Sequence, residues 1–200
     1  STPIKSSAAS DVYKRQIDAA CNSFGQTINV NMMQMMAAYC SIINGGMLYQ
    51  PHIVKRIESA NGEVVKEYKA NLVRQTITAS TSKLLRRYLK NTVEEGTAKK
   101  AGVTGYSVAG KTGTAQKGDR KDNKWIISCI GHPPAENPKF AIYVVIDEPY
   151  GTTGTSGSSA DVLTLTHNIL EKLLPYMNVY KDASDEYEDT SSSPDELTVD

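Results

Sequence analysis

The chain has 200 residues, 40% of them hydrophobic, which is enough for one domain with a buried core. Basic and acidic residues number 22 each, but residues 181–200 carry eight of the acids and only one basic residue, Lys181, so residues 1–180 have a net charge of +7. The basic side chains are neither gathered on one predicted helix nor interleaved with aromatic residues, so the composition argues against nucleic-acid binding.

Cysteine and histidine patterns give no indication of a disulfide framework, a metal site or a cofactor. The cysteines form no C-x-x-C pair, and the histidines have no second ligand four residues away; they are Cys21, Cys40, Cys129, His52, His132 and His167. No apolar run reaches the roughly 18 residues that a membrane-spanning helix needs. We therefore expect no metal and no cofactor.

The N-terminal third predicts a lead-in, a helix and a hairpin. Residues 1–16 show no periodicity and are interpreted as a disordered or artefactual lead-in. Asn31 and Gln34 form a capping-box pattern, helical apolar spacing follows, and Asn44-Gly45-Gly46 ends the helix. Asn61-Gly62 then separates two alternating runs, residues 51–57 and 63–68, which is the strongest short-range signal for a β-hairpin.

A second helix is predicted over residues 81–95, and the stretch after it carries the chemistry. In Val108-Ala109-Gly110-Lys111-Thr112-Gly113-Thr114, a strand would put Lys111 and Gly113 on one face and Thr112 and Thr114 on the other. A lysine beside hydroxyl groups and free N–H groups suits a carboxylate ligand, and the glycines let a ligand approach the backbone. Taken alone, the stretch is equally compatible with a surface strand that binds nothing.

Two apolar runs, residues 125–130 and 140–147, follow a polar loop over residues 117–124 and are joined by a proline-rich turn. With the Lys111 strand they predict an antiparallel meander. A flexible loop is expected over 151–157, a last helix over 158–174, and an acidic, serine-rich disordered tail over 179–200. The fold class predicted is α+β, an antiparallel sheet covered by helices.

A P-loop is the rival interpretation, because Gly105 to Thr112 satisfies G-x-x-x-x-G-K-[ST] and Asp147 could help to hold magnesium. A P-loop must end in a helix whose N–H groups face the phosphates. Residues 113–124 show no helical apolar stripe. A nucleoside-triphosphatase is therefore kept as an alternative from another class of function.

Lys111-Thr112-Gly113-Thr114 resembles the third motif of the penicillin-binding transpeptidases and serine β-lactamases. The similarity extends to Ser23-Phe24-Gly25-Gln26, the capped helix ending in Asn44-Gly45-Gly46, Pro51-His52-Ile53-Val54, residues 130–141 and Val144-Val145-Ile146-Asp147-Glu148-Pro149. Residues 17–178 resemble in this way the C-terminal part of the transpeptidase domain of class B penicillin-binding proteins.

The resemblance implies a D,D-transpeptidase that cross-links peptidoglycan through a serine acyl-enzyme, with D-Ala-D-Ala stem peptides as substrates and β-lactams as inhibitors. Lys111 would set the local positive field, and the hydroxyl groups of Thr112 and Thr114 would hold the terminal carboxylate of the substrate. Gly113 would let the ligand lie against the strand, and the Thr114 N–H would form half of the oxyanion hole. The parent chain would be membrane-anchored, work with other cell-wall synthesis proteins, and act at the extracytoplasmic face of a bacterial plasma membrane.

Two expected motifs are missing, because the family's S-x-x-K, which holds the nucleophile, and its S-x-N have no counterpart upstream of Gly25-Gln26. Ala20-Cys21-Asn22 lacks the serine, and Gly25-Gln26-Thr27 replaces the family's Gly-Gln-Gly. The chain is therefore expected to be an incomplete C-terminal half that is inactive alone. A β-lactamase and a β-lactam-sensing receptor domain remain as alternatives within the superfamily.

Overall fold

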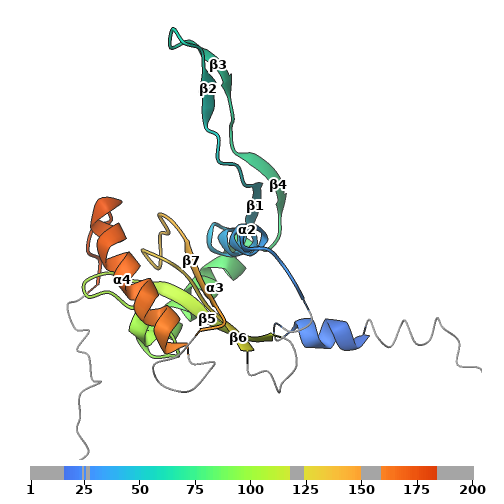
Figure 1. Cartoon of the computed structure of the whole chain (residues 1–200), viewed down its shortest axis with the longest axis vertical. Coiled ribbons are helices and arrows are strands. Elements are labelled where there is room, and N and C mark those ends of the chain that lie inside the picture. Colours follow the sequence, from blue (N-terminus) through green and yellow to red (C-terminus); the bar gives the residue numbers. More distant parts are fainter. Residues whose placement is uncertain (1–15, 24, 26–27, 118–123, 150–158, 184–200) are drawn as a thin grey trace, which may run out of the picture. The chain divides into compact units, whose positions relative to one another are not determined.

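The computed structural model describes residues 16–23, 25, 28–117, 124–149 and 159–183 (Figure 1). The chain divides into two units, residues 1–35 and 36–200, and each is considered by itself. The predicted lead-in, except Gln16, lies outside the described residues, as do the predicted loop over 151–157 and the tail beyond residue 183. In the first unit residues 16–22 are helical.

Helix α2 (Met32–Ile43) begins where the capping pattern predicts it. The Gln34 N–H donates to Asn31 Oδ1 at 2.9 Å, and the Asn31 N–H donates to Gln34 Oε1 at 3.0 Å. These two bonds satisfy donors that the first turn of a helix otherwise leaves without partners. The helix ends before two glycines in the left-handed region, Gly45 with φ +93° and Gly46 with φ +94°. The predicted helix is confirmed.

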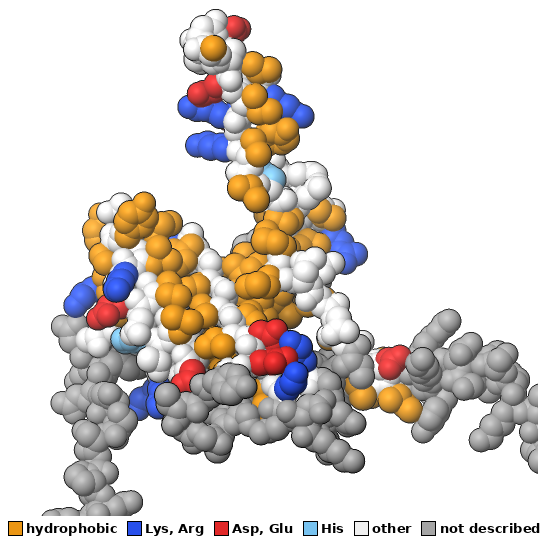
Figure 2. Space-filling view, viewed as in Figure 1, with side chains coloured by type: hydrophobic (Ala, Val, Ile, Leu, Met, Phe, Trp, Pro, Cys, Tyr) orange, Lys and Arg blue, Asp and Glu red, His pale blue; other side chains and the backbone are white. Residues whose placement is uncertain are grey.

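The hairpin predicted around Asn61-Gly62 is present and shorter than its sequence pattern. Strand β2 (Arg56–Glu58) pairs antiparallel with β3 (Val64–Glu67), and Gly62 supplies a positive φ in the turn. Every residue of β2 and β3 is exposed, and hydrophobic side chains lie beside Lys and Arg side chains along this hairpin in Figure 2. A second pair, β1 (Met47–Gln50) with β4 (Asn71–Gln75), was not predicted.

Helix α3 (Ala79–Glu94) starts two residues earlier than predicted. The side chain of Thr78 is its N-cap and accepts a hydrogen bond from the Thr81 N–H at 3.2 Å. Ser82 is fully buried and joins α3 to the end of α2, because its Oγ donates to the Ile42 carbonyl at 2.6 Å. A short 3-10 helix, η1 (Lys99–Ala101), follows.

The predicted antiparallel meander is confirmed. Strands β5 (Ala109–Lys117), β6 (Lys124–His132) and β7 (Ile142–Asp147) form one sheet in the order β5-β6-β7. Lys111 pairs with Ile130, which in turn pairs with Tyr143. Among the described residues β5 pairs with β6 alone, so its other side is an open edge.

Helices pack against both faces of this sheet. One face carries Ile127 and Cys129 and packs against buried residues of α4 (Ala160–Tyr176), which are Val162, Leu163, Leu170 and Leu174. On the other face Ile130 packs with Tyr39 and Ile43 of α2 and with Leu89 of α3. Burial of apolar side chains on both faces stabilises the sheet between its helices, and the predicted α+β class is confirmed.

The C-terminal segment differs from the prediction of a tail that begins at residue 179. Val179 is buried in the core beside α4, and the N–H groups of Asp182 and Ala183 donate to the Gly105 carbonyl. Acidic composition indicated disorder here, but a single apolar anchor and backbone hydrogen bonds to a distant loop order residues 179–183. None of the helices in the described ranges has both the length and the apolar character needed to cross a membrane.

Candidate active site

The four residues of the K-T-G-T stretch lie in the middle of β5, with the side-chain alternation that the sequence predicts. Lys111 and Gly113 pair with Ile130 and Ser128, on the face covered by α2 and α3. The other two residues, Thr112 and Thr114, pair with Cys129 and Ile127, on the face covered by α4. Because β5 is an edge strand, the backbone groups on its side away from β6 pair with no other strand among the described residues.

Lys111 and Thr114 are exposed, whereas Thr112 is half-buried. The ammonium group of Lys111 donates to the Thr112 carbonyl at 3.0 Å, which keeps its charge close to the strand. The Thr112 hydroxyl lies 3.4 Å from the hydroxyl of Thr97, in the turn between α3 and η1. A cation and two hydroxyl groups therefore stand on one short edge, which suits an anionic ligand.

Two glycines of β5 have close neighbours across the sheet. A Cβ on Gly113 would lie 2.6 Å from Ser128 Oγ, and one on Gly110 would lie 2.7 Å from the Ile130 carbonyl oxygen. Both distances are shorter than van der Waals contact. The Ile130 carbonyl is part of the sheet backbone, so cross-strand packing requires glycine at position 110. The Ser128 hydroxyl can rotate away, so this contact does not by itself require glycine at position 113.

The thiol behind Thr112 belongs to the core. Cys129 is buried, and burial raises the pKa of its thiol, although a hydrogen bond with Thr166 and the charge of Lys111 act in the opposite direction. A neutral thiol of this kind is a poor nucleophile. Cys129 therefore packs the sheet against α4.

The P-loop interpretation is wrong. Lys111 and Thr112 lie three and four residues into a continuous nine-residue strand, so no helix N-terminus begins at Thr112. Asp147, which that interpretation assigned to magnesium, instead accepts two hydrogen bonds from Lys117 Nζ, at 3.0 and 2.9 Å. The local pattern matched, but an extended backbone cannot direct consecutive N–H groups at a phosphate.

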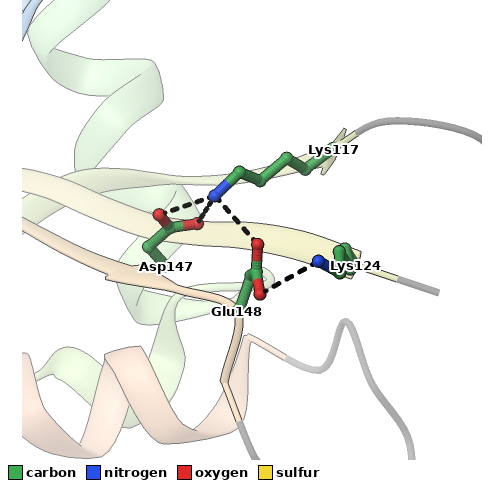
Figure 3. Close-up of polar contacts among 4 residues, drawn as sticks. All are labelled: Lys117, Lys124, Asp147 and Glu148. Carbon is green, nitrogen blue, oxygen red and sulfur yellow. Dashed lines mark hydrogen bonds and ion pairs between the residues drawn. The ribbon is translucent and has the colours of Figure 1, made fainter. Parts of the chain in front are cut away.

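An ion-pair cluster lies where β5 ends, β6 begins and β7 ends (Figure 3). It was not predicted from the sequence. Lys117 Nζ lies 2.9 Å from Glu148 Oε1, and Lys124 Nζ lies 3.5 Å from Glu148 Oε2. Hydrogen bonds with Asp147 and Glu148 raise the pKa of Lys117, and the bond with Lys117 lowers the pKa of Glu148. The cluster joins the three strand ends, but its exposure to solvent weakens each pair.

Comparison with known proteins agrees with this architecture. Residues 3–171 match the family model for the penicillin binding protein transpeptidase domain. The chain is 39% identical over 167 residues to stage V sporulation protein D of Bacillus subtilis, covering 82% of this chain and 26% of the relative. It is 34% identical over 139 residues to a probable peptidoglycan D,D-transpeptidase PenA of Neisseria meningitidis, covering 68% of this chain and 22% of the relative.

Solved structures give the same result. A crystal structure of penicillin binding protein 3 from Mycobacterium tuberculosis, complexed with aztreonam, aligns with a TM-score of 0.71 and 30% identity, over 83% of this chain and 39% of that one. The transpeptidase domain of Burkholderia pseudomallei penicillin-binding protein 3 aligns with a TM-score of 0.67 and 27% identity, over 84% and 49% of the two chains. The chain spans about a quarter of the length of the curated relatives named above. With most of its residues matched by the family model, the chain belongs to the penicillin-binding protein transpeptidase family.

Proposed function

We propose that this chain supplies the K-T-G edge of a serine D,D-transpeptidase site that cross-links peptidoglycan. The observation that carries the proposal is an open strand edge on which Lys111 and Thr114 are exposed. Relatives named peptidoglycan D,D-transpeptidase support the reaction, and penicillin binding protein 3 structures with aztreonam and ampicillin support β-lactams as inhibitors. The nucleophile would come from residues outside this chain.

In this proposal Lys111 supplies the positive field for the carboxylate of a D-Ala-D-Ala stem peptide, and the Thr112 and Thr114 hydroxyl groups hold that carboxylate. Residues two apart on a strand direct their N–H groups to the same side. The Thr112 carbonyl accepts from the Lys111 side chain, which favours Thr112 and Thr114 as the residues whose backbone groups face the open edge. The Thr114 N–H then stabilises the oxyanion, and Gly113 leaves room for the ligand.

The proposal includes a longer parent protein that is anchored in the plasma membrane, acts on its extracytoplasmic side and works with other cell-wall synthesis proteins. The relative named a probable peptidoglycan D,D-transpeptidase supports cell-wall synthesis as the process. A β-lactamase or a β-lactam sensor would use the same K-T-G edge but would not transfer the acyl group to the amine of a second stem peptide. Formation of cross-linked product separates these alternatives.

The test uses the polypeptide encoded by the complete reading frame, labelled with a fluorescent penicillin. Lys111→Ala should lower the acylation rate by about 100-fold or more, because one preorganised electrostatic contact in such sites contributes about 3–4 kcal/mol to the transition state. Lys111→Arg should also be slow, because a planar guanidinium does not replace a compact ammonium. Lys172→Ala, which removes an exposed lysine of α4, is the matched control and should acylate at the parent rate.

Two substitutions of Thr114 distinguish the role of its side chain from the role of its backbone N–H. Thr114→Ala keeps the N–H and should slow acylation less than Thr114→Pro, which deletes it and should cost about 100-fold or more. Circular dichroism confirms that each variant is folded. Acylation of both Lys111→Ala and Thr114→Pro at the parent rate would show that β5 is not the active-site edge.

A further inference from the structure

The chain returns to the start of β5 after its last helix. Asn178 adopts φ 53°, which turns the chain, and the Val179 N–H donates to the Leu174 carbonyl at 3.0 Å. Val179 is buried, and the next residues lie along residues 105–107, where the Asp182 N–H donates to the Gly105 carbonyl at 3.0 Å. We name residues 179–183 the C-terminal strap.

Besides buried Val179 and the backbone bonds to Gly105, the strap is attached through the carboxylate of Asp182. Asp182 Oδ1 accepts from the Ser107 N–H at 2.7 Å, and Asp182 Oδ2 accepts from the Ser107 hydroxyl. Hydrogen bonds to an ionised carboxylate are about twice as strong as neutral ones. Ser107 is only 9% exposed, so water competes little for these two bonds.

Ser107 also joins the strap to the end of β6. The Ala135 N–H donates both to Ser107 Oγ and to the Ser107 carbonyl, at 3.0 Å each. The Ala135 carbonyl accepts from His132 Nε2 at 3.1 Å, and His132 pairs with Ala109 at the first position of β5. Three segments distant in sequence therefore meet at Ser107, four residues before Lys111.

We infer that Asp182 is a positioning residue for the K-T-G strand, acting through Ser107. Asp182 fixes the base of β5, and because Val108 and Ala109 are buried between this anchor and Lys111, a shift at Ser107 is passed along the strand. A displacement of about 1 Å in a catalytic group can cost about 100-fold in rate. The inference rests on the proposed function for its effect on acylation, but not for its effect on β5.

Amide hydrogen exchange tests the effect on β5 in the polypeptide of the complete reading frame. Asp182→Ala should speed exchange in residues 108–113 by about 10-fold or more and leave α3 unchanged, because local opening is separable from global unfolding. Asp182→Asn keeps an oxygen for the Ser107 N–H and should rescue most of the protection. Glu171→Gln, at an exposed acid of α4, is the matched control and should change nothing.

Two exchange results would overturn the inference. One is unchanged exchange in residues 108–113 of Asp182→Ala. The other is equal acceleration in β5 and α3, since that would mean a general loss of stability. Ser107→Ala provides a second variant, because it removes one bond to Asp182 and one to Ala135 while keeping the Ser107 N–H.

Penicillin acylation tests the consequence. Asp182→Ala should lower the acylation rate constant by about 10-fold to 100-fold at saturating penicillin, with a smaller change in the dissociation constant, and Asp182→Asn should lie between it and the parent. Acylation of Asp182→Ala at the parent rate would remove the positioning role and leave the proposed function standing. If the unmodified polypeptide does not acylate but β5 exchanges faster in Asp182→Ala, the proposed function would be wrong, while the effect of Asp182 on β5 would stand.

Discussion

His132 is a fully buried histidine whose two ring nitrogens both have partners. The Ala135 carbonyl can only accept, so His132 Nε2 donates to it, and Nδ1 accepts from the Tyr39 hydroxyl at 2.8 Å. Burial lowers the pKa of His132 to about 4, against an opposing contribution from Ala135 and with a further lowering by the charge of Arg86. Burial likewise raises the pKa of Tyr39, so both partners stay neutral.

The free energy of unfolding of the chain should decrease as the pH falls, because of His132. An unfolded histidine binds a proton below about pH 6.5, whereas the folded one does so only near pH 4, so the unfolded state gains protons as the pH falls between these values. The free energy of unfolding should drop by about 2 kcal/mol between about pH 7.5 and about pH 5. Urea unfolding at the two pH values measures it.

His132→Gln keeps one donor and one acceptor but does not titrate, so it should flatten this dependence whatever its effect at neutral pH. His52→Gln, at an exposed histidine, should leave the dependence as it is. A parent and a His132→Gln variant with the same pH dependence would show that His132 is not its source.

Some residues at and around the site could be predicted from the sequence, and others could not. Lys111 and its neighbours carry a recognisable motif, so their strand and alternation could be predicted. Asp182 could not, because it is one acid in an acidic segment and its partner Ser107 lies 75 positions earlier. Thr97 beside Thr112 was missed for the same reason, since a hydroxyl contact between two distant segments leaves no local signal.

Among the elements, local signals predicted α2, α3, α4, the β2–β3 hairpin and the β5–β6–β7 meander. Strands β1 and β4 were missed, because they pair across the hairpin and their register shifts between Leu48 and Tyr49, which breaks the alternation. The pair begins at Gly46, whose carbonyl accepts from the Thr76 N–H at 2.7 Å. The Asn44-Gly45-Gly46 turn therefore both ends α2 and starts this pair.

Gly45 and Gly46 should respond differently to the same substitution. Both have φ near +90°, where a side chain costs about 1–2 kcal/mol, but a Cβ on Gly46 would lie 1.9 Å from the Ile77 carbonyl oxygen, while one on Gly45 meets nothing within 4 Å. Gly46→Ala should lower the free energy of unfolding by about 3 kcal/mol or more, and Gly45→Ala by about 1 kcal/mol. Denaturant unfolding of the two variants decides it, and equal losses would contradict the contact with Ile77.

At the scale of the whole molecule, the chain has one edge of the proposed site and no recognisable nucleophile. It covers 26% of the Bacillus subtilis relative, and its S-x-x-K match, Ser80 to Lys83, lies in the first turn of α3, downstream of Gly25-Gln26 and not upstream of it as in the family. An acyl-enzyme needs an activated nucleophile within reach of the bound carbonyl, and Lys111 and Thr114 only orient the ligand and stabilise charge in the proposed mechanism. Covalent chemistry is therefore expected to require residues beyond these 200.

The 200-residue chain should accordingly form no covalent adduct with penicillin, whereas the polypeptide of the complete reading frame should gain the mass of one penicillin per molecule. Intact-mass spectrometry after incubation measures both, and peptide mapping of the longer polypeptide should place the adduct on a serine of an S-x-x-K motif encoded upstream. Heat-denatured polypeptide is the control for nonspecific acylation. A stoichiometric adduct on a serine within residues 17–178 would show that the chain carries its own nucleophile, and the division of the site proposed here would be wrong.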